Sequence, residues 1–186
     1  MTRDPRPLLP RWLRRSALAV GILAVAVALA GLPLYVFPPA AEPAPADLVY
    51  VIGPPVPART DLQTRLLDEG VAPRGLISVS PPGGSDPASS VPACRDPRIA
   101  CLTPEPFTTA GEALLLGRYA ADHGVERTIV ITFTPHVARS RYIFDTCYPG
   151  EVTVVAVDPH LTPWEWVYQY AYQTGAFAKA VLAPCS

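Results

Sequence analysis

The sequence lacks the glycine-rich motifs that mark several large classes of α/β enzyme. No G-x-G-x-x-G follows any β-rich segment, which disfavours a nicotinamide-dependent enzyme. No G-x-S-x-G is present, which disfavours an α/β-hydrolase, and a P-loop is also missing. Chemistry must therefore come from individual titratable side chains, and histidine is scarce among them, with three in the chain.

Basic residues are sparse outside the N-terminal region. Ten of the 15 basic residues but 15 of the 16 acidic ones follow residue 37, which gives that part a net charge of −5. An acidic domain without a basic stripe argues against a nucleic acid as a partner.

The chain has no C-x-x-C spacing, which disfavours a zinc site, and no metal ligands are predicted. Its four cysteines favour two disulfides, for which three pairings exist. The pairing Cys94–Cys101 with Cys147–Cys185 is favoured, because "CRDPRIAC" closes a short loop and the other bridge would join a helix end to the C-terminus.

One long apolar run stands out, at residues 16–37. Its 22 residues carry no charge, enough for a helix to cross a hydrocarbon core of roughly 30 Å. Five arginines and a single acid, Asp4, precede it, so the positive-inside rule places a basic tail, residues 1–15, in the cytoplasm and the rest of the chain outside.

Two alternatives to a membrane anchor remain for this run. The segments "ALA" and "APA" would suit cleavage of a signal peptide, but the apolar region of a signal peptide spans only about 7 to 15 residues. A buried core helix is disfavoured by the length and by the flanking arginines. A single-pass anchor is therefore expected, followed by a proline-alanine tether at residues 38–46 and an extracytoplasmic domain at residues 47–186.

The domain alternates short β-rich segments with segments of helical periodicity. Strands are expected at 47–53, 75–80, 127–133 and 151–158, and helices at 58–70, 108–124, from 134 onward and at 163–183. Residues 81–107 show no periodicity and are expected to form a long, ordered, functional loop. Such alternation predicts an α/β domain with a mostly parallel sheet and helices on both faces.

A candidate site lies in "TFTPHVARSRYIF", which follows the third expected strand. Thr134 is predicted to cap a helix, with Pro135 in its first turn and His136 next. A helix start attracts anions, Arg139 offers a guanidinium fork on the same face, and a histidine shuttles protons near neutral pH. The alternative is structural, with His136 capping its helix and Arg139 pairing with Glu112 or Asp158.

A second helix start, "LTPEPFTTAGE", supplies carboxyl and hydroxyl groups. Thr109 and Glu112 match the T-x-x-E capping box, which is the favoured explanation for that pair, while Glu105 and Thr108 are freer to meet a ligand. Ligands of open parallel sheets bind at the carboxyl ends of the strands, where the turn at Gly53 is also expected.

The last helix is rich in aromatic residues. These are expected to pack the helix against the domain rather than to stack on a ligand, and they are Trp164, Trp166, Tyr168, Tyr170 and Tyr172.

Three segments resemble landmarks of the YdcF/SanA/ElyC-like family of domains of unknown function: "EPFTTAGEALLLGRYAADHG", "IVITFTPHVARSRYIF" and "YAYQTGAFAKA". The resemblance covers roughly residues 47–183, and its most specific element is a T-x-x-E helix start about 27 residues before a strand followed by H-x-x-R. It implies a Rossmann-like three-layer sandwich behind a membrane anchor and a role in the bacterial cell envelope.

By position, the H-x-x-R of the family matches His136 and Arg139, and its acidic and threonine positions match Glu105, Thr109 and Glu112. The chain departs from the family at "GPPVPAR", where only Gly53 of a glycine-rich turn remains, and at Gln173, where an acid is common.

The leading functional hypothesis is an exported protein that acts on a phosphorylated or otherwise anionic envelope precursor, free or lipid-linked. Arg139 and a helix start would hold the anion, His136 would transfer a proton, and Glu105 or Glu112 would be the second titrating group. The alternative is a non-catalytic ligand-binding or scaffold module in envelope biogenesis. No cofactor is assigned from the sequence.

Overall fold

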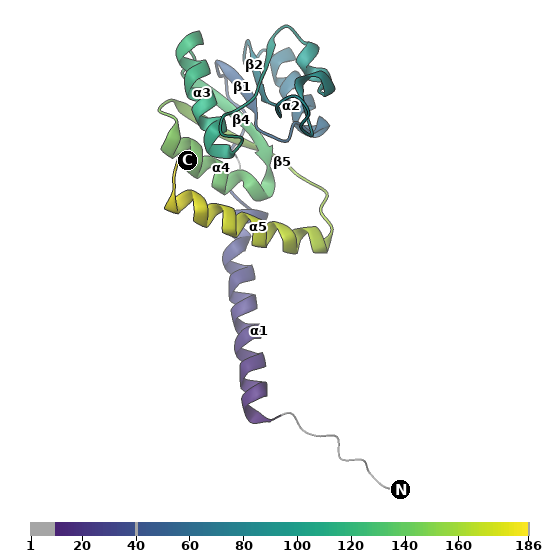
Figure 1. Ribbon diagram of the computed structural model, residues 1–186, viewed down its shortest axis with the longest axis vertical. Helices are drawn as coiled ribbons and strands as arrows, with labels where there is room; N and C mark the ends of the chain where they lie inside the picture. The colour runs from purple at the N-terminus through teal and green to yellow at the C-terminus, as the bar shows by residue number, and fades with distance from the viewer. Residues whose placement is uncertain (1–9, 40, 186) are drawn as a thin grey trace.

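The computed structural model describes residues 10–39 and 41–185 (Figure 1). Helices are α1 (Arg11–Gly31), α2 (Pro57–Asp68), α3 (Thr109–His123), α4 (Val137–Cys147) and α5 (Pro163–Leu182). Strands are β1 (Leu48–Val51), β2 (Gly75–Ser78), β3 (Ile99–Leu102), β4 (Arg127–Phe133) and β5 (Glu151–Val157). Short helical turns are η1 (Leu32–Val36), η2 (Ala88–Ser90), η3 (Pro92–Arg95) and η4 (Thr134–His136).

The five strands form one parallel sheet in the order β3-β2-β1-β4-β5. This arrangement confirms the predicted Rossmann-like α/β fold. The chain runs outward from β1 through β2 to β3 and then crosses to β4 on the other side of β1. The strand order therefore reverses between β1 and β4, and a crevice opens at such a point beside the carboxyl ends of the strands.

Strand β3 corrects the expectation that residues 81–107 form only a loop. Residues Ile99–Leu102 pair in parallel with Gly75–Ser78 of β2. The segment is too short for its own alternation to be informative, and the sheet edge and the Cys94–Cys101 disulfide stabilise it instead.

Helices cover both faces of the sheet and form two apolar cores. On one face α3, α4 and part of α5 pack on β1 and β4, with Leu116 and Phe144 fully buried. On the other face α2 and the segment that leads into η3 pack on the sheet through Leu66, Val91 and their neighbours. Burial on both faces explains why β1 is apolar throughout rather than alternating.

The capping of α3 differs from the prediction. Thr108, not Thr109, is the N-cap, and its side chain accepts a hydrogen bond from the amide of Gly111. Glu112 does not close a capping box, because the third position after Thr108 is Gly111, and the Glu112 carboxyl accepts a hydrogen bond from the amide of Gly53 instead. Gly124 ends the helix in the left-handed conformation, φ 65°, that a glycine adopts without steric cost.

Both disulfides have the favoured pairing. Cys94 bonds to Cys101 across the short loop before β3, and Cys147, at the end of α4, bonds to Cys185 near the C-terminus.

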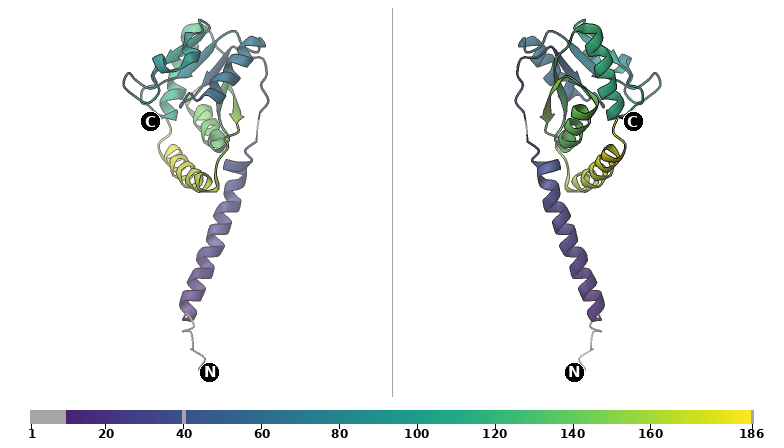
Figure 2. Two further views of the ribbon diagram at one scale, coloured as in Figure 1. Left: turned by 90° about the vertical axis from the view of Figure 1, so that its right-hand side faces the viewer. Right: turned by 90° about the vertical axis from the view of Figure 1, so that its left-hand side faces the viewer.

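The apolar N-terminal segment forms one continuous helical rod that projects from the domain (Figures 1 and 2). It spans Arg11–Val36, with the last five residues in η1, and its length and apolar composition suit a membrane span or a signal sequence. The helix begins at Arg11, five residues before the predicted start of the apolar run at Ser16, so its first turns include Arg11, Arg14 and Arg15. Most of the predicted basic tail, residues 1–9, lies outside the described residues.

Candidate functional site

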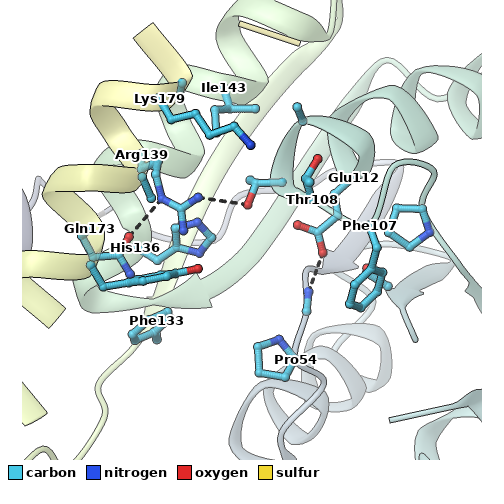
Figure 3. Close-up of a pocket in the computed structure, with 18 of the residues that line it drawn as sticks. Pro54, Phe107, Thr108, Glu112, Phe133, His136, Arg139, Ile143, Gln173 and Lys179 are labelled. Carbon is cyan, nitrogen blue, oxygen red and sulfur yellow. Dashed lines mark hydrogen bonds between the residues drawn. The ribbon is translucent and has the colours of Figure 1, made fainter. Parts of the chain in front are cut away.

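A cavity of about 1000 Å³ lies beside the switch point between β1 and β4. Its floor is formed by residues that follow β1 and β4, one wall by the first turn of α3, and the opposite wall by α4 and α5 (Figure 3). Among the predicted site residues, His136, Arg139, Thr108, Thr109, Glu112 and Gly53 all line it. The two helix starts singled out in the sequence therefore do meet at one cavity.

His136 lies at the base of the cavity and is 4% exposed. Its Nδ1 is 3.0 Å from Oγ1 of Thr132, a hydrogen bond that orients the ring. Its Nε2 is buried and, within the described part of the chain, has no hydrogen-bond partner. Burial lowers the pKa of His136 well below its usual 6.5, and the nearby Arg139 and Arg59 lower it further, so the ring is neutral at pH 7.

The neutrality of His136 corrects the expectation of a histidine that titrates near pH 7. The sequence placed the ring at a solvated helix start, but the structure places it in the turn η4, covered by neighbouring elements. Thr134 is likewise not a helix cap. It lies within η4, and its hydroxyl donates a hydrogen bond to Asp158, which follows β5.

Arg139 projects from the first turn of α4 into the cavity (Figure 3). Its Nε donates to Oε1 of Gln173 at 3.0 Å, and an Nη donates to Oγ1 of Thr109 at 3.4 Å. The guanidinium also lies 5.8 Å from the centre of the Tyr172 ring. Neither Glu112 nor Asp158 forms a salt bridge with it among the described residues, so the structural pairing considered from the sequence is not the one observed.

The residue type at position 173 affects the charge of Arg139. An acid there would neutralise Arg139, whereas the glutamine amide orients the guanidinium without removing its charge. Burial lowers the pKa of Arg139 below that of a free arginine, with smaller opposing effects of Tyr172 and Glu112. An arginine guanidinium is nevertheless a cation at neutral pH.

Glu112 enters the cavity from the other side, opposite His136 (Figure 3). The amide of Gly53 donates to its Oε1 at 2.7 Å, so this amide holds the carboxyl in place. Glu112 is 6% exposed, and burial raises its pKa from 4.5 to about 7, against the lowering effects of the Gly53 amide, Arg139 and Arg59. Glu112, rather than His136, is thus the group whose protonation changes near neutral pH.

Arg59 belongs to the site but was not predicted from the sequence. Its guanidinium donates to the carbonyl oxygens of Ile52, Gly53 and Pro54, and lies 4.9 Å from the centre of the Phe133 ring. It therefore fixes the turn after β1. Burial lowers its pKa to about 10, which leaves it charged at pH 7. The sequence did not predict that Arg59 is buried, because the helical segment that contains it is rich in polar residues.

Glu105 was predicted as a second titrating group, but it is exposed and does not line the cavity. The chain turns there so that Pro104 and Phe107 face the cavity instead. Thr108 and Thr109 do lie on its wall, with Thr108 occupied as the cap of α3.

The balance of charge in the cavity is positive. Arg59, Arg139 and Lys179 contribute three cations, while the acids on its walls are Asp86 and Glu112, the second of which is partly protonated at pH 7. The start of α3 adds the positive end of the helix dipole. Together these groups favour a small anion.

No family model, no curated protein and no solved structure matches this chain.

Proposed function

We propose that this chain is a YdcF-like protein of the cell envelope, anchored in the membrane by α1 with its N-terminus in the cytoplasm and its α/β domain outside. The two disulfides support an oxidising compartment for the domain. Retention of the anchor is supported by Tyr35 in η1, which is 4% exposed and packs edge-on against Tyr170 at 5.2 Å between ring centres. Removing the segment would uncover this part of the domain.

The ligand that we propose is a phosphorylated envelope precursor or a similar small anion. One observation carries this proposal: the buried Nε2 of His136 has no partner within the described residues and lies in the same cavity as the cation Arg139. An unsatisfied buried polar atom costs about 1 to 3 kcal/mol, and a ligand oxygen would relieve that cost. Arg139 would bind the phosphate oxygens in pairs, opposite the amides that begin α3.

Glu112 is the proposed proton-transfer group. A carboxyl with a pKa of about 7 is present in both protonation states at neutral pH, which suits general acid or base catalysis. His136, being neutral, would accept or donate a hydrogen bond according to its tautomer rather than carry a charge. Gly53 and Arg59 would position the carboxyl and the turn that holds it.

Ligand-induced stabilisation of the full-length chain tests the proposal. Thermal unfolding would be followed in lipid nanodiscs with inorganic phosphate, sugar phosphates and a polyprenyl phosphate. The variant Arg139→Gln is compared with Arg141→Gln, which removes the same charge two residues away, where the side chain donates to Pro39 outside the cavity.

A bound ligand at 100 times its dissociation constant stabilises by about 2.7 kcal/mol. We expect this stabilisation in the parent and in Arg141→Gln but not in Arg139→Gln. Equal stabilisation of all three chains, or of none by any of the phosphates, would refute the assignment.

Turnover separates the enzyme from a binding or scaffold module. Any product released from a stabilising phosphorylated ligand would be measured for the parent and for Glu112→Gln. Loss of turnover in this variant with binding retained supports a proton-transfer role, whereas stabilisation without turnover in the parent favours the non-catalytic alternative.

A further inference from the structure

Helix α5 carries an exposed stripe without any charged residue. Its members recur at spacings of three and four, so they lie on one face: Trp164, Val167, Ala171, Thr174, Ala178 and Val181. All six are exposed, Trp164 by 78% and Val167 by 58%, and Leu182 beside them by 85%. The sequence-based expectation that the aromatic residues would pack this helix is thus wrong for Trp164, and it is also wrong for Tyr168 and Tyr172, which are exposed and line the cavity.

The charged residues of α5 lie away from this stripe. At 100° per residue, Glu165 and Lys179 fall about 100° or more from its centre, and Lys179 lines the cavity. The buried side of the helix holds Gln173 and Ala180 against the domain. The helix therefore has one face toward the domain and another that is uncharged and exposed, on which Thr174 contacts Tyr35 at the end of the apolar rod and Ala171 borders the cavity.

The stripe is adjacent to the end of the apolar N-terminal helix. The hydroxyl of Tyr170 donates to the carbonyl of Ala28 at 3.2 Å, and the hydroxyls of Tyr35 and Thr174 are 3.0 Å apart. A Cβ on Gly31 would lie 2.2 Å from the Tyr170 ring, so a glycine is required for this close contact. The contacts fix the middle of α5 to the last turns of the apolar rod.

The two helices also have the orientation that a membrane surface requires. Figure 1 shows α5 lying across the direction of α1, beside the end of the rod. If α1 spans the bilayer, α5 must lie near the plane of its surface, at the level where the apolar run ends. An amphipathic helix in that place inserts its apolar face at the boundary between headgroups and acyl chains, with tryptophan at the headgroup level.

We infer that the stripe of α5 rests on the bilayer that holds α1. Because the other side of the same helix lines the cavity with Tyr168, Tyr172 and Lys179, the mouth of the cavity is held beside the headgroups. A lipid-linked phosphate could then reach Arg139 without leaving the membrane. This inference depends on α1 being retained as an anchor, as proposed above.

Quenching of Trp164 by brominated phospholipids tests the inference in the full-length chain. The variants Trp12→Phe and Trp166→Phe are combined so that Trp164 is the one tryptophan left, since the chain has three. The matched control replaces Trp164 with Phe as well and carries Asp122→Trp in the last turn of α3, at the end of the domain away from α1 (Figure 1). Both proteins are reconstituted in nanodiscs that hold one chain each.

We expect emission from Trp164 to be blue-shifted and to lose several times more intensity to the brominated lipid than emission from the control. Adding Val167→Glu and Val181→Glu at these exposed positions should reverse both effects, while circular dichroism shows that the helix remains. Trp164 emission that is unquenched, like the control, would overturn the inference. Blue-shifted emission without quenching would overturn it too, because protein rather than lipid would then cover the stripe.

Extraction at alkaline pH separates the two proposals. A chain that is washed from the membrane refutes the anchor itself, whereas a chain that stays in the membrane with an unquenched Trp164 refutes only the surface contact of α5.

Discussion

The buried carboxyl of Glu112 predicts an unusual dependence of stability on pH. Its pKa is raised to about 7 in the folded chain and returns to about 4.5 on unfolding. Between these two values the folded state binds more protons at Glu112 than the unfolded state, so the contribution of this group to stability is highest at low pH and falls as the pH rises through 7. The difference corresponds to about 3 kcal/mol for this single group.

The variant Glu112→Gln isolates the contribution of Glu112. The glutamine carbonyl can still accept the Gly53 amide, but the side chain no longer titrates. The free energy of unfolding of the parent minus that of the variant should therefore fall by about 3 kcal/mol between pH 4 and pH 8, because other groups cancel in the difference. The depressed pKa of His136 acts oppositely in both chains, lowering stability as the pH falls below about 6.5.

Chemical denaturation in detergent from pH 4 to pH 8 gives this difference, and carbon-13 NMR of the glutamate carboxyls provides a direct check. One glutamate resonance should titrate near pH 7 in the parent and be missing from Glu112→Gln. If every glutamate titrated near 4.5 and the stability difference did not vary with pH, the carboxyl would not be desolvated and the proton-transfer role would lose its basis.

Two further changes test the packing around the site. Gly111→Ala should destabilise the fold by about 1 to 3 kcal/mol, since a Cβ there would lie 1.8 Å from the Pro106 carbonyl oxygen. Gly117→Ala in the same helix is the control, because its Cβ would meet no atom closer than 3.9 Å, and it should be neutral or stabilising. Thermal unfolding of the two variants measures the difference. Replacing both Cys147 and Cys185 by serine should cost about 4 kcal/mol by the loop-entropy relation, measured by denaturant unfolding, and an unchanged midpoint would show that this bridge does not constrain the unfolded chain.

Much of the fold was readable from short-range patterns. The apolar strands, the helix stops at glycine and the apolar rod are encoded within windows of 4 to 22 residues, where periodicity and capping act. The pairing of Cys94 with Cys101 also followed from local spacing, and the pairing of Cys147 with Cys185 followed as the remaining bridge. Strand β3 was not predicted because a segment of four residues is too short to show a periodic pattern, and its partner strand β2 lies more than 20 residues earlier in the chain.

The sequence predicted where the site residues lie but not which of them change protonation near neutral pH. His136, Arg139 and Glu112 were expected to converge because the carboxyl ends of parallel strands share one edge of the sheet. Their protonation was not predictable, because a pKa depends on burial and on neighbours distant in sequence. The amide that holds the Glu112 carboxyl belongs to Gly53, 59 residues away.

By itself, the sequence determined the class of fold, the apolar N-terminal helix and several residues that border the cavity, among them His136, Arg139 and Glu112, since each follows from local periodicity or from the geometry of parallel sheets. Tertiary structure alone decided that Glu112 rather than His136 titrates near pH 7, that Arg59 is buried beneath the first turn, and that α5 lies beside the end of α1. These outcomes depend on desolvation and on contacts between distant segments, which no local pattern specifies.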